Sequence, residues 1–229
     1  MTDFPVGPLV DTTPAQLPGP VTLQGRYGTV TRLAAGRHGP ELWEAFRGHD
    51  EIWTYLSSYG PFTNGAAFLA WLRERVPLTD PYYYAILDAD GRAVGLSTLM
   101  EIRPVMRVIE VGHIVYSPAL QRTRLGTEAQ YMLARYAFEM LGYRRYEWKC
   151  NSLNAPSRAA AVRYGFAYEG TLRQRIIAKG RSRDDAYFSM LDSEWPARKR
   201  AFERWLEPEN FDSDGNQQVS LADLNKMQA

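Results

Sequence analysis

The chain has 229 residues, of which 45% are hydrophobic, and its formal net charge is +1. It is therefore long enough to bury a sizeable core, and its balanced charge gives no reason to expect binding to nucleic acid or to a membrane surface. A single cysteine, Cys150, excludes an internal disulfide framework and fits a reducing compartment. The start of the chain lacks the pattern of a signal peptide, and no apolar run approaches membrane-spanning length, so we expect a cytoplasmic protein.

The first 22 residues are rich in proline, with Pro5, Pro8, Pro14, Pro18 and Pro20. Proline sustains neither a helix nor a central strand, so this segment predicts an extended arm. The pattern leaves open whether the arm covers this subunit's site or that of a second copy in a homodimer.

The rest of the chain alternates short apolar runs with helical segments, which predicts one α/β domain over residues 23–206 and a polar tail over residues 207–229. Asn64 or Thr63 is the expected cap of the second helix, and Ser193 that of the last helix. In chain order, the expected elements are a strand at Gly25–Leu33, helices at Glu41–Gly48 and Ala66–Val76, strands at Tyr82–Leu87 and Val94–Met100, a strand from Ile109 to the Ser117-Pro118 break, a helix at Glu128–Leu141, a strand at Tyr146–Cys150, a helix at Asn154–Tyr164, strands at Phe166–Thr171 and Ala186–Leu191, and a helix at Ser193–Leu206.

Four aromatic residues, Trp53, Tyr55, Tyr59 and Phe62, lie between the first two helices. Two interpretations stay open for them. Core packing of the helices is favoured at each single position, whereas a shared role would be the wall of a substrate cavity.

The acidic spacing from Asp212 to Asp223 in the tail matches several positions of a calcium-binding loop. The sixth position, however, is Gln217 instead of glycine, and the twelfth is Asp223 instead of glutamate. We therefore expect no metal in this chain.

The centre of the chain joins a β-branched strand to a helix through the polar segment Gln121–Thr127. A strand, a turn and a helix N-terminus in this order expose unpaired backbone amides at the positive end of the helix dipole. Such a pocket favours an anion, most naturally a phosphate. Arg122 and Arg124 lie in the turn and can add charge-assisted contacts.

The order of three motifs carries a family resemblance: Gln121-x-x-Arg124-x-Gly126, then Asn154-x-x-Ser157, then Tyr164-Gly165-Phe166. Together they resemble the GNAT acyltransferase superfamily, and the Thr127-Glu128-Ala129 continuation with the Asn-x-x-Ser element is similar to its RimJ/RimL-like branch of ribosomal-protein alanine acetyltransferases. The resemblance covers about Gly25 to Leu191.

By this resemblance, the fold is a mixed, mostly antiparallel twisted sheet flanked by helices, with a splayed pair of parallel strands near Glu110–Tyr116 and Tyr146–Cys150. Acetyl-coenzyme A (acetyl-CoA) would bind between these strands as co-substrate, with its pyrophosphate on the amides of the central turn. The cofactor-binding residues that the resemblance implies are Ile114, Val115, Tyr116, Gln121, Arg122, Thr123, Arg124, Leu125, Gly126, Thr127, Asn154 and Ser157.

Two positions depart from the family pattern. Arg124 stands where members usually have glycine, and we expect its side chain to point outward and leave the amides available. Ala161 stands where many members have a tyrosine that protonates the departing thiolate, and Tyr164 is out of phase with that position. Ser157 is therefore our candidate for this acid.

The general base is left unassigned between Glu110, His113 and Glu147. His113 has a suitable ordinary pKa, but a lone histidine on an apolar strand is more often a core residue. Strict alternation would place His113 with Val111 and Val115, on the face opposite to Glu110. Cys150 is expected to be a buried, inert thiol rather than a nucleophile.

These observations predict an N-acetyltransferase that moves an acetyl group from acetyl-CoA to a primary amine by direct attack. The expected acceptor is a small molecule or an amino acid-like metabolite. Two alternatives stay open: acetylation of a protein N-terminus, and a coenzyme A-binding or ligand-sensing module without efficient catalysis, which Arg124 and Ala161 motivate.

Overall fold

Eight strands form one sheet in the order β1-β2-β3-β4-β5-β6-β8-β7, in a computed structural model that describes residues 4–227. The strands are β1 (Thr22–Gln24), β2 (Thr29–Arg32), β3 (Tyr82–Leu87), β4 (Ala93–Arg103), β5 (Val108–Tyr116), β6 (Arg145–Asn151), β7 (Ala167–Ala178) and β8 (Arg181–Leu191). The helices are α1 (Ala35–Phe46), α2 (Gly65–Arg75), α3 (Arg124–Arg135), α4 (Ala155–Arg163), α5 (Trp195–Leu206) and α6 (Leu221–Met227). Short helical turns lie at η1 (Asp50–Trp53), η2 (Pro104–Met106), η3 (Tyr136–Met140) and η4 (Pro208–Asn210).

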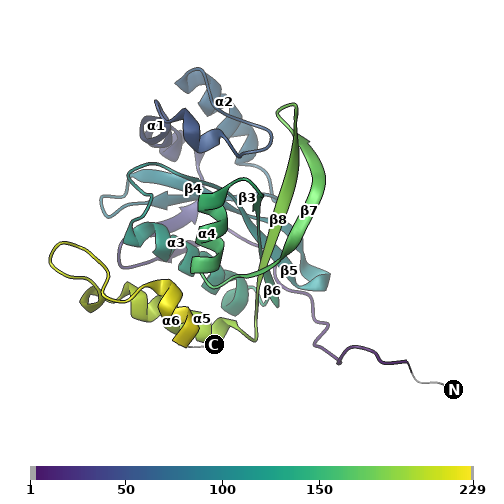
Figure 1. Ribbon diagram of the computed structural model, residues 1–229. Helices are drawn as coiled ribbons and strands as arrows, with labels where there is room; N and C mark the ends of the chain where they lie inside the picture. Colours follow the sequence, from purple (N-terminus) through teal and green to yellow (C-terminus); the bar gives the residue numbers. More distant parts are fainter. Residues whose placement is uncertain (1–3, 228–229) are drawn as a thin grey trace.

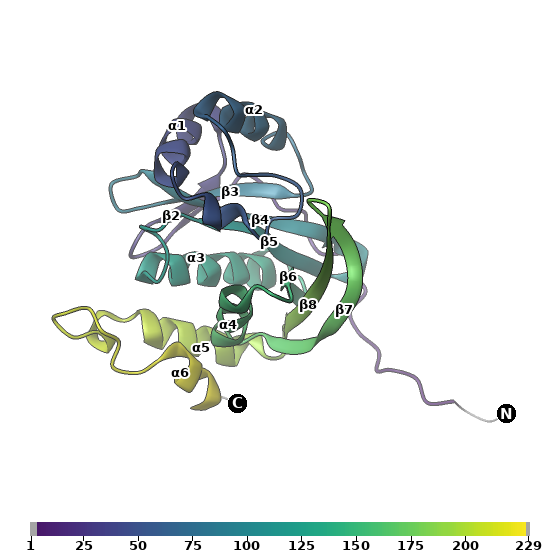
Figure 2. The same cartoon turned by 45° about the horizontal axis from the view of Figure 1, so that its top comes forward.

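Helices cover both faces of the sheet (Figures 1 and 2). α1 and α2 lie over one face, where Leu42 and Phe68 are fully buried. α3 and α5 lie over the other face, where Met132 and Phe202 are buried. Every strand pair is antiparallel except β5 with β6. The predicted fold class, a mixed and mostly antiparallel sheet flanked by helices, is confirmed.

The parallel pair separates halfway along its length. β5 and β6 are in register over four residue pairs, from Val108 opposite Arg145 to Val111 opposite Trp148. Beyond these pairs the two strands continue without pairing each other. The backbone groups of Gly112–Tyr116 that face β6 therefore have no strand partner and are open to a ligand.

A bulge in β5 corrects the predicted side-chain alternation. Gly112 pairs with Thr98 and Val115 pairs with Leu96, so β5 has one residue more than β4 in this interval. His113 has a left-handed backbone, with φ of 46°. A bulge of this kind shifts the alternation by one position. Val111 consequently packs on the α3 side and Val115 on the α1/α2 side.

Two predicted element boundaries are wrong near the start of the domain. The predicted strand Gly25–Leu33 is a turn followed by the short strand β2, with Gly25 donating its amide to the carbonyl of Gly28. The buried carboxylate of Glu128 accepts hydrogen bonds from the amides of Arg26 and Tyr27 in this turn. This long-range contact replaces strand pairing there. α1 also begins six residues before the predicted Glu41.

The central helix and the last one also differ from expectation. α3 begins at Arg124 instead of Glu128, because the Thr123 hydroxyl caps it by accepting from the amide of Gly126 at 3.0 Å. α5 begins at Trp195 and has no side-chain cap, so the predicted cap at Ser193 is wrong.

β7 and β8 form a long hairpin at the edge of the sheet, which extends well past the predicted strands (Figures 1 and 2). Lys179 and Gly180 join the strands with positive φ values of 49° and 74°. A two-residue turn of this handedness suits the twist of antiparallel strands. The missed part of β7 is largely exposed. Its sequence consequently lacks the apolar alternation that would have revealed a strand.

The C-terminal segment packs against the domain instead of trailing from it. Leu221 and Leu224 of α6 are buried in the core on the α5 side. Phe211 packs on Trp205 with ring centroids 5.1 Å apart. The Ser220 hydroxyl accepts from the amide of Asp223 at 3.1 Å and so opens α6.

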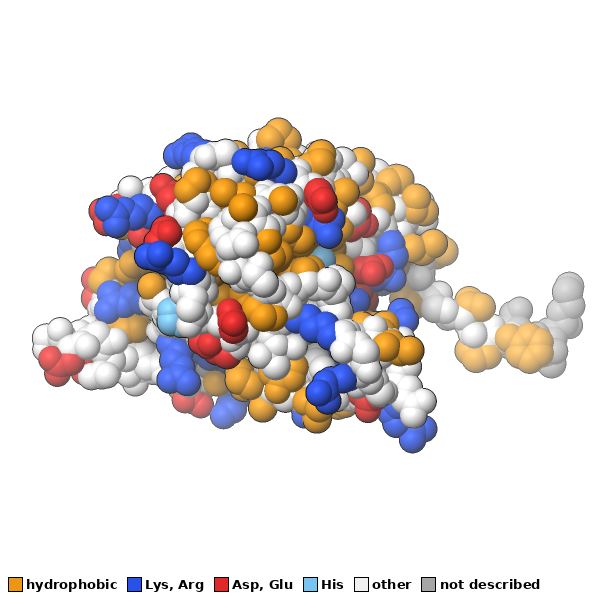
Figure 3. All heavy atoms as spheres, turned by 90° about the horizontal axis from the view of Figure 1, so that it is seen from above, with side chains coloured by type: hydrophobic (Ala, Val, Ile, Leu, Met, Phe, Trp, Pro, Cys, Tyr) orange, Lys and Arg blue, Asp and Glu red, His pale blue; other side chains and the backbone are white. Residues whose placement is uncertain are grey.

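The arm is extended over the described residues 4–21, which form no helix or strand. Figure 3 shows it reaching away from the body of the molecule. The side chains of Phe4, Val6 and Leu9 are largely exposed. Its second half is anchored, since Ala15 and Gln16 donate amides to the carbonyls of Pro104 and Leu141. Within residues 4–227, none of the helices is long and apolar enough to cross a membrane.

Candidate active site

Two adjoining cavities lie where β5 and β6 separate. The larger has a volume of about 1210 Å³ and extends from the splayed strands to the N-terminus of α3. The smaller has a volume of about 300 Å³ and lies between β5, β6 and the β7–β8 hairpin. The residues that line both cavities are Ile52, Tyr55, Ile114, Trp148, Asn154 and Ser157. The two cavities therefore adjoin at these residues.

The N-terminus of α3 forms one end of the larger cavity. The first amides of a helix lack intrahelical partners, and here the Thr123 hydroxyl satisfies that of Gly126. A side chain at Gly126 would place a Cβ 2.8 Å from the Leu120 carbonyl oxygen. Glycine is thus required for this turn to approach β5 closely, and the remaining amides give the cavity an anion-binding end.

Arg124 lies against the C-terminal segment. Its guanidinium carbon is 3.9 Å from the ring centroid of Phe211 and 5.6 Å from that of Tyr27. Arg122, in the same turn, has a left-handed backbone with φ of 61° and an exposed side chain. Both arginines line the larger cavity.

Ser157 lies at the junction of the two cavities, on the first turn of α4. Its hydroxyl oxygen accepts a hydrogen bond from Trp148 Nε1 at 3.1 Å. Because the indole is a donor only, the hydroxyl proton of Ser157 is left to donate elsewhere. The Asn154 side chain caps α4 by accepting from the Ser157 amide at 3.1 Å, which fixes the position of this residue.

The twelve residues implied as cofactor-binding are not all in the cavity. Two of them, Val115 and Leu125, have side chains buried in the core. The others line the larger cavity: Ile114, Tyr116, Gln121, Arg122, Thr123, Arg124, Gly126, Thr127, Asn154 and Ser157. The Tyr116 hydroxyl is held in place by donating to the Gly126 carbonyl at 2.9 Å and accepting from Nε2 of the Gln130 side chain at 2.7 Å.

Glu110 lines the smaller cavity and is 3% exposed. Burial raises the pKa of this carboxyl to about 7, against the opposing effect of Lys149, whose Nζ lies 3.3 Å from Glu110 Oε2. Burial alone would lower the pKa of Lys149, but the neighbouring Glu110 and Tyr187 raise it overall. Glu110 therefore exchanges its proton near neutral pH beside a fixed positive charge.

His113 lines the same cavity as Glu110, because the bulge removes the predicted separation of their faces. Burial, reinforced by the cations Lys149, Arg75 and Arg183, lowers the pKa of His113 to about 4. Its Nδ1 lies 3.0 Å from the Tyr83 hydroxyl. The imidazole is thus neutral at physiological pH and held in position by tyrosine.

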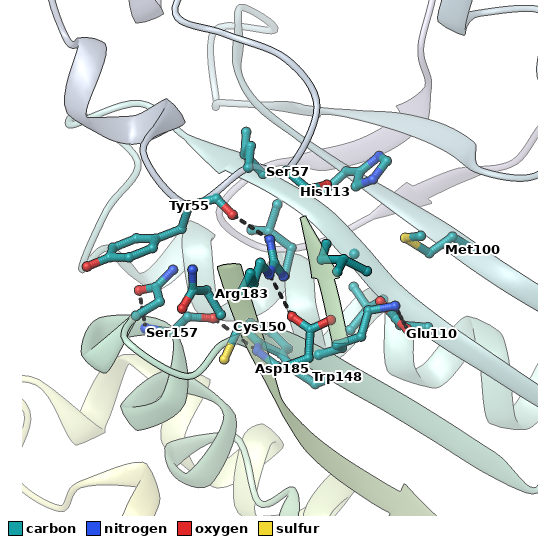
Figure 4. Close-up of a pocket in the computed structure, with 18 of the residues that line it drawn as sticks. Tyr55, Ser57, Met100, Glu110, His113, Trp148, Cys150, Ser157, Arg183 and Asp185 are labelled. Atoms are coloured by element: carbon teal, nitrogen blue, oxygen red, sulfur yellow. Dashed lines mark hydrogen bonds and ion pairs between the residues drawn. The ribbon is translucent and has the colours of Figure 1, made fainter. Parts of the chain in front are cut away.

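The β7–β8 hairpin and the segment after η1 close the smaller cavity (Figure 4). Arg183 connects them, with Nε donating to Asp185 Oδ1 at 2.6 Å and Nη1 donating to the Tyr55 carbonyl at 2.9 Å. At the hairpin tip, Lys179 Nζ donates to the Trp53 carbonyl at 2.8 Å.

Both interpretations of the aromatic connection apply, at different residues. Trp53 and Tyr59 are buried in the core under α1 and α2, as favoured for each position. Tyr55 is 36% exposed and lines both cavities. Phe62 packs on Trp53 with ring centroids 5.2 Å apart.

Several cavity residues escaped the sequence analysis. Arg163 lines the larger cavity, and burial lowers the pKa of its guanidinium. It donates to the Thr127 hydroxyl at 3.1 Å and stacks over Trp205 at 4.7 Å. Its place two residues before Gly165 could have drawn attention to it. Trp205 of α5 also lines this cavity, together with Phe211 and Gly215–Gln217 from the C-terminal segment after α5, and no local sequence signal points to them.

Three other residues singled out in the sequence have clear environments. Cys150 is buried, and burial raises the pKa of its thiol, which agrees with an unreactive state. Ala161 is fully buried. Tyr164 packs between Trp148 and Phe202 and lines the larger cavity. Burial raises the pKa of the Tyr164 hydroxyl.

In the calcium-like loop of the tail, the carboxylate of Asp212 accepts hydrogen bonds from backbone amides of the same loop. Asp212 Oδ1 accepts from the amides of Asp214 and Asn216 at 3.0 and 2.8 Å. These bonds give the loop its turn conformation.

The site therefore combines a helix N-terminus beside splayed parallel strands with a second, adjoining cavity that contains a buried carboxylate. Comparison with known proteins identifies the class. The sequence profile of the acetyltransferase (GNAT) domain matches residues 32–167. The chain therefore belongs to the GNAT acetyltransferase family, and it is an acetyltransferase enzyme.

Two solved structures are similar over most of the chain. A GCN5-related N-acetyltransferase from Brucella melitensis is 43% identical, with a TM-score of 0.91, and the match covers 93% of this chain and 98% of that one. A protein from Chromobacterium violaceum assigned to the GNAT family is 42% identical, with a TM-score of 0.79, over 86% of this chain and 100% of that one.

A further similarity is to YdaF of Bacillus subtilis (strain 168), a candidate ribosomal N-acetyltransferase by its name. It is 32% identical over 110 residues, which are 48% of this chain. The match spans 60% of the length of that relative. The predicted RimJ/RimL-like branch of the GNAT superfamily agrees with this similarity.

Proposed function

We propose that this enzyme transfers the acetyl group of acetyl-CoA, bound in the larger cavity, directly to a primary amine bound in the smaller one. The junction of the two cavities at Tyr55, Trp148 and Ser157 is the observation that carries the proposal. A ternary complex needs both substrates within reach of each other, and this junction provides it.

The larger cavity fits acetyl-CoA in three respects. Its volume is ample for a long ligand, and the unpaired edge of Gly112–Tyr116 suits the amide-bearing pantetheine arm. The amides of Arg122, Arg124 and Leu125 suit a pyrophosphate, since those of Gln121, Thr123, Gly126 and Thr127 already donate within the protein. Arg163 adds a positive charge that has no acidic partner among residues 4–227. When bound, the cofactor supplies a thioester carbonyl that an amine can attack.

The chain then has to move protons and hold a developing negative charge. Glu110 accepts the proton that the amine loses, because its pKa of about 7 matches the working pH better than that of about 4 for His113. A backbone amide of Gly112–Val115 stabilises the oxyanion. Ser157 donates its hydroxyl proton toward the departing thiolate, while Trp148 fixes the hydroxyl oxygen.

The size and closure of the smaller cavity favour a small acceptor. A volume of about 300 Å³ is at the lower end for ligand pockets, and the contacts of Arg183 and Lys179 close it on the hairpin side. An amino acid-like amine fits such a space. A single buried thiol agrees with action in the cytoplasm.

A protein N-terminus is the second candidate acceptor. The name of the similar YdaF suggests a ribosomal substrate for that protein. One terminal residue of a peptide would also fit the smaller cavity if the following residues left through its opening.

The proposal is tested first by calorimetric titration of acetyl-CoA, followed by thiol release with a panel of small amines and of peptides with free N-termini. We expect micromolar binding and turnover with at least one amine class. Turnover with peptides and with none of the small amines would identify a protein N-terminus as the acceptor. Absence of binding would refute the assignment of the larger cavity.

A further inference from the structure

A double bulge in β7 faces the smaller cavity. Leu172 pairs with Asp185 and Ile176 with Arg183, so three residues of β7 stand opposite the single residue Asp184 of β8. The middle one, Gln174, has a left-handed backbone with φ of 49°, and its amide donates to Asp184 Oδ1 at 2.7 Å. Bulges redirect side chains and are common beside active sites. The residue that follows Gln174 is Arg175, which lines the cavity.

Arg175 is the cation of this cavity that lacks an acidic partner. Lys149 is paired with Glu110, and Arg183 is paired with Asp185. No carboxylate in the described part of the chain, residues 4–227, lies within ion-pair distance of Arg175. Its charge is therefore available to a bound anion, and a guanidinium binds a carboxylate with two parallel hydrogen bonds.

A negative charge in the same cavity lies near Glu110 and Lys149. Glu101, on β4, lines it without an ion pair of its own among the residues described. Its charge acts on Glu110 and Lys149, where it raises the pKa of both groups. An incoming ammonium group would therefore find negative charge beside the proposed base, whereas an anionic group would find Arg175.

From this arrangement we propose that the acceptor carries a carboxylate in addition to its amine, and that Arg175 binds the carboxylate while the amine is directed to Glu110. The inference rests on the proposed function and narrows its substrate class to amino acids and related zwitterions. The same chemistry is offered by a free amino acid and by a peptide with an acidic second residue. Arg175 is accordingly a specificity-determining residue.

The test compares each of several amino acids with its carboxamide, which keeps the amine and removes the negative charge. The wild type is compared with Arg175→Gln and with Arg173→Gln, a matched control on the exposed part of β7 that does not line the cavity. Two peptide arms, with glutamate or glutamine as second residue, separate the peptide source from the free amino acid. Turnover is followed by thiol release, and acceptor binding by ligand-observed NMR with coenzyme A present.

We expect the wild type to prefer acids over amides by about tenfold or more in kcat/KM, as a charged hydrogen-bonded pair allows. Arg175→Gln should remove this preference through loss on the acids alone, while Arg173→Gln should retain it and all three proteins should bind acetyl-CoA equally. Equal use of acids and amides by the wild type, or a preference that survives Arg175→Gln, would overturn the inference.

The binding measurement separates this inference from the proposed function. Selective binding of acids without turnover of any amine would leave the role of Arg175 standing and refute the catalytic proposal. Turnover of amines without selectivity for acids over carboxamides, in turnover and in binding, would support the catalytic proposal and refute the role of Arg175. Preference for the glutamate peptide over free amino acids would support the same carboxylate contact and assign it to a peptide acceptor.

Discussion

Replacement of Glu110 by glutamine tests the proposed base directly. The side chain is buried and its pKa is raised to about 7, so half of the enzyme carries the carboxylate at neutral pH and about a tenth at pH 6. Below neutrality, kcat/KM of the wild type should therefore fall about tenfold per pH unit. Glu110→Gln should lower kcat by about 10²–10⁴-fold, the usual contribution of general base catalysis, and abolish this limb of the pH profile.

The neighbouring cation gives a second, signed expectation. Lys149 lowers the pKa of Glu110 by its charge and by its hydrogen bond. Lys149→Met should therefore raise the pKa and move the acidic limb to higher pH, whereas Glu110→Gln should remove the limb.

The assay is thiol release at saturating acetyl-CoA between pH 5.5 and 9, with thermal unfolding of each variant as the control for folding. A Glu110→Gln enzyme that kept its rate within threefold and the same limb near pH 7 would refute the reasoning. His113 could not take over this limb, since its pKa is about 4.

Four further outcomes follow from the geometry. The folded-state pKa of Glu110 lies above its ordinary value of 4.5, so its contribution to stability is present below pH 4.5 and lost as pH rises through about 7. Between these pH values, chemical denaturation should show the free energy of unfolding falling by about 3 kcal/mol more in the wild type than in Glu110→Gln. Ser157→Ala should lower kcat with little change in the dissociation constant of acetyl-CoA, and equal losses in both would assign Ser157 to binding only. Gly126→Ala should cost about 1–3 kcal/mol of stability in calorimetry because its Cβ would meet the Leu120 carbonyl, and an unchanged Tm would contradict the close approach. Arg124→Ala should speed hydrogen exchange in the segment around Phe211, while unaltered exchange would show that the stacking contact does not hold that segment.

Local chemistry explains which elements were predictable from the sequence. Asn64 caps α2 by accepting from the Ala67 amide at 2.9 Å, as expected for an asparagine before a helical pattern. The hairpin of β3 and β4 and the end of α4 at Gly165, with φ of 92°, are equally local. Such features depend on residues within one turn of each other, so the sequence displays them.

Contacts between distant segments explain most of the errors. The turn at residues 25–28 depends on the carboxylate of Glu128, a hundred residues later. The bulge at His113 directly follows Gly112, a lone glycine in a strand pattern, and it changes which side chains share a face. Arg175 stands in a segment whose exposed, arginine-rich sequence is typical of a loop. The sequence analysis therefore named most residues that line the larger cavity, and Glu110, His113 and Tyr55 of the smaller one, but it did not point to Arg175 or Arg183.

The short ladder between β5 and β6 has a mechanical consequence. Only four residue pairs join the block β1–β5 to the block β6, β8 and β7 through the sheet, whereas β6 and β8 share seven. The sheet is thus weakest where it opens, and a relative rotation of the two blocks would widen or narrow both cavities together. A ligand that lies along the separated edges would make the backbone hydrogen bonds that β5 and β6 do not make to each other there. Substrate entry and the stiffness of the whole sheet are then governed by the same few backbone groups.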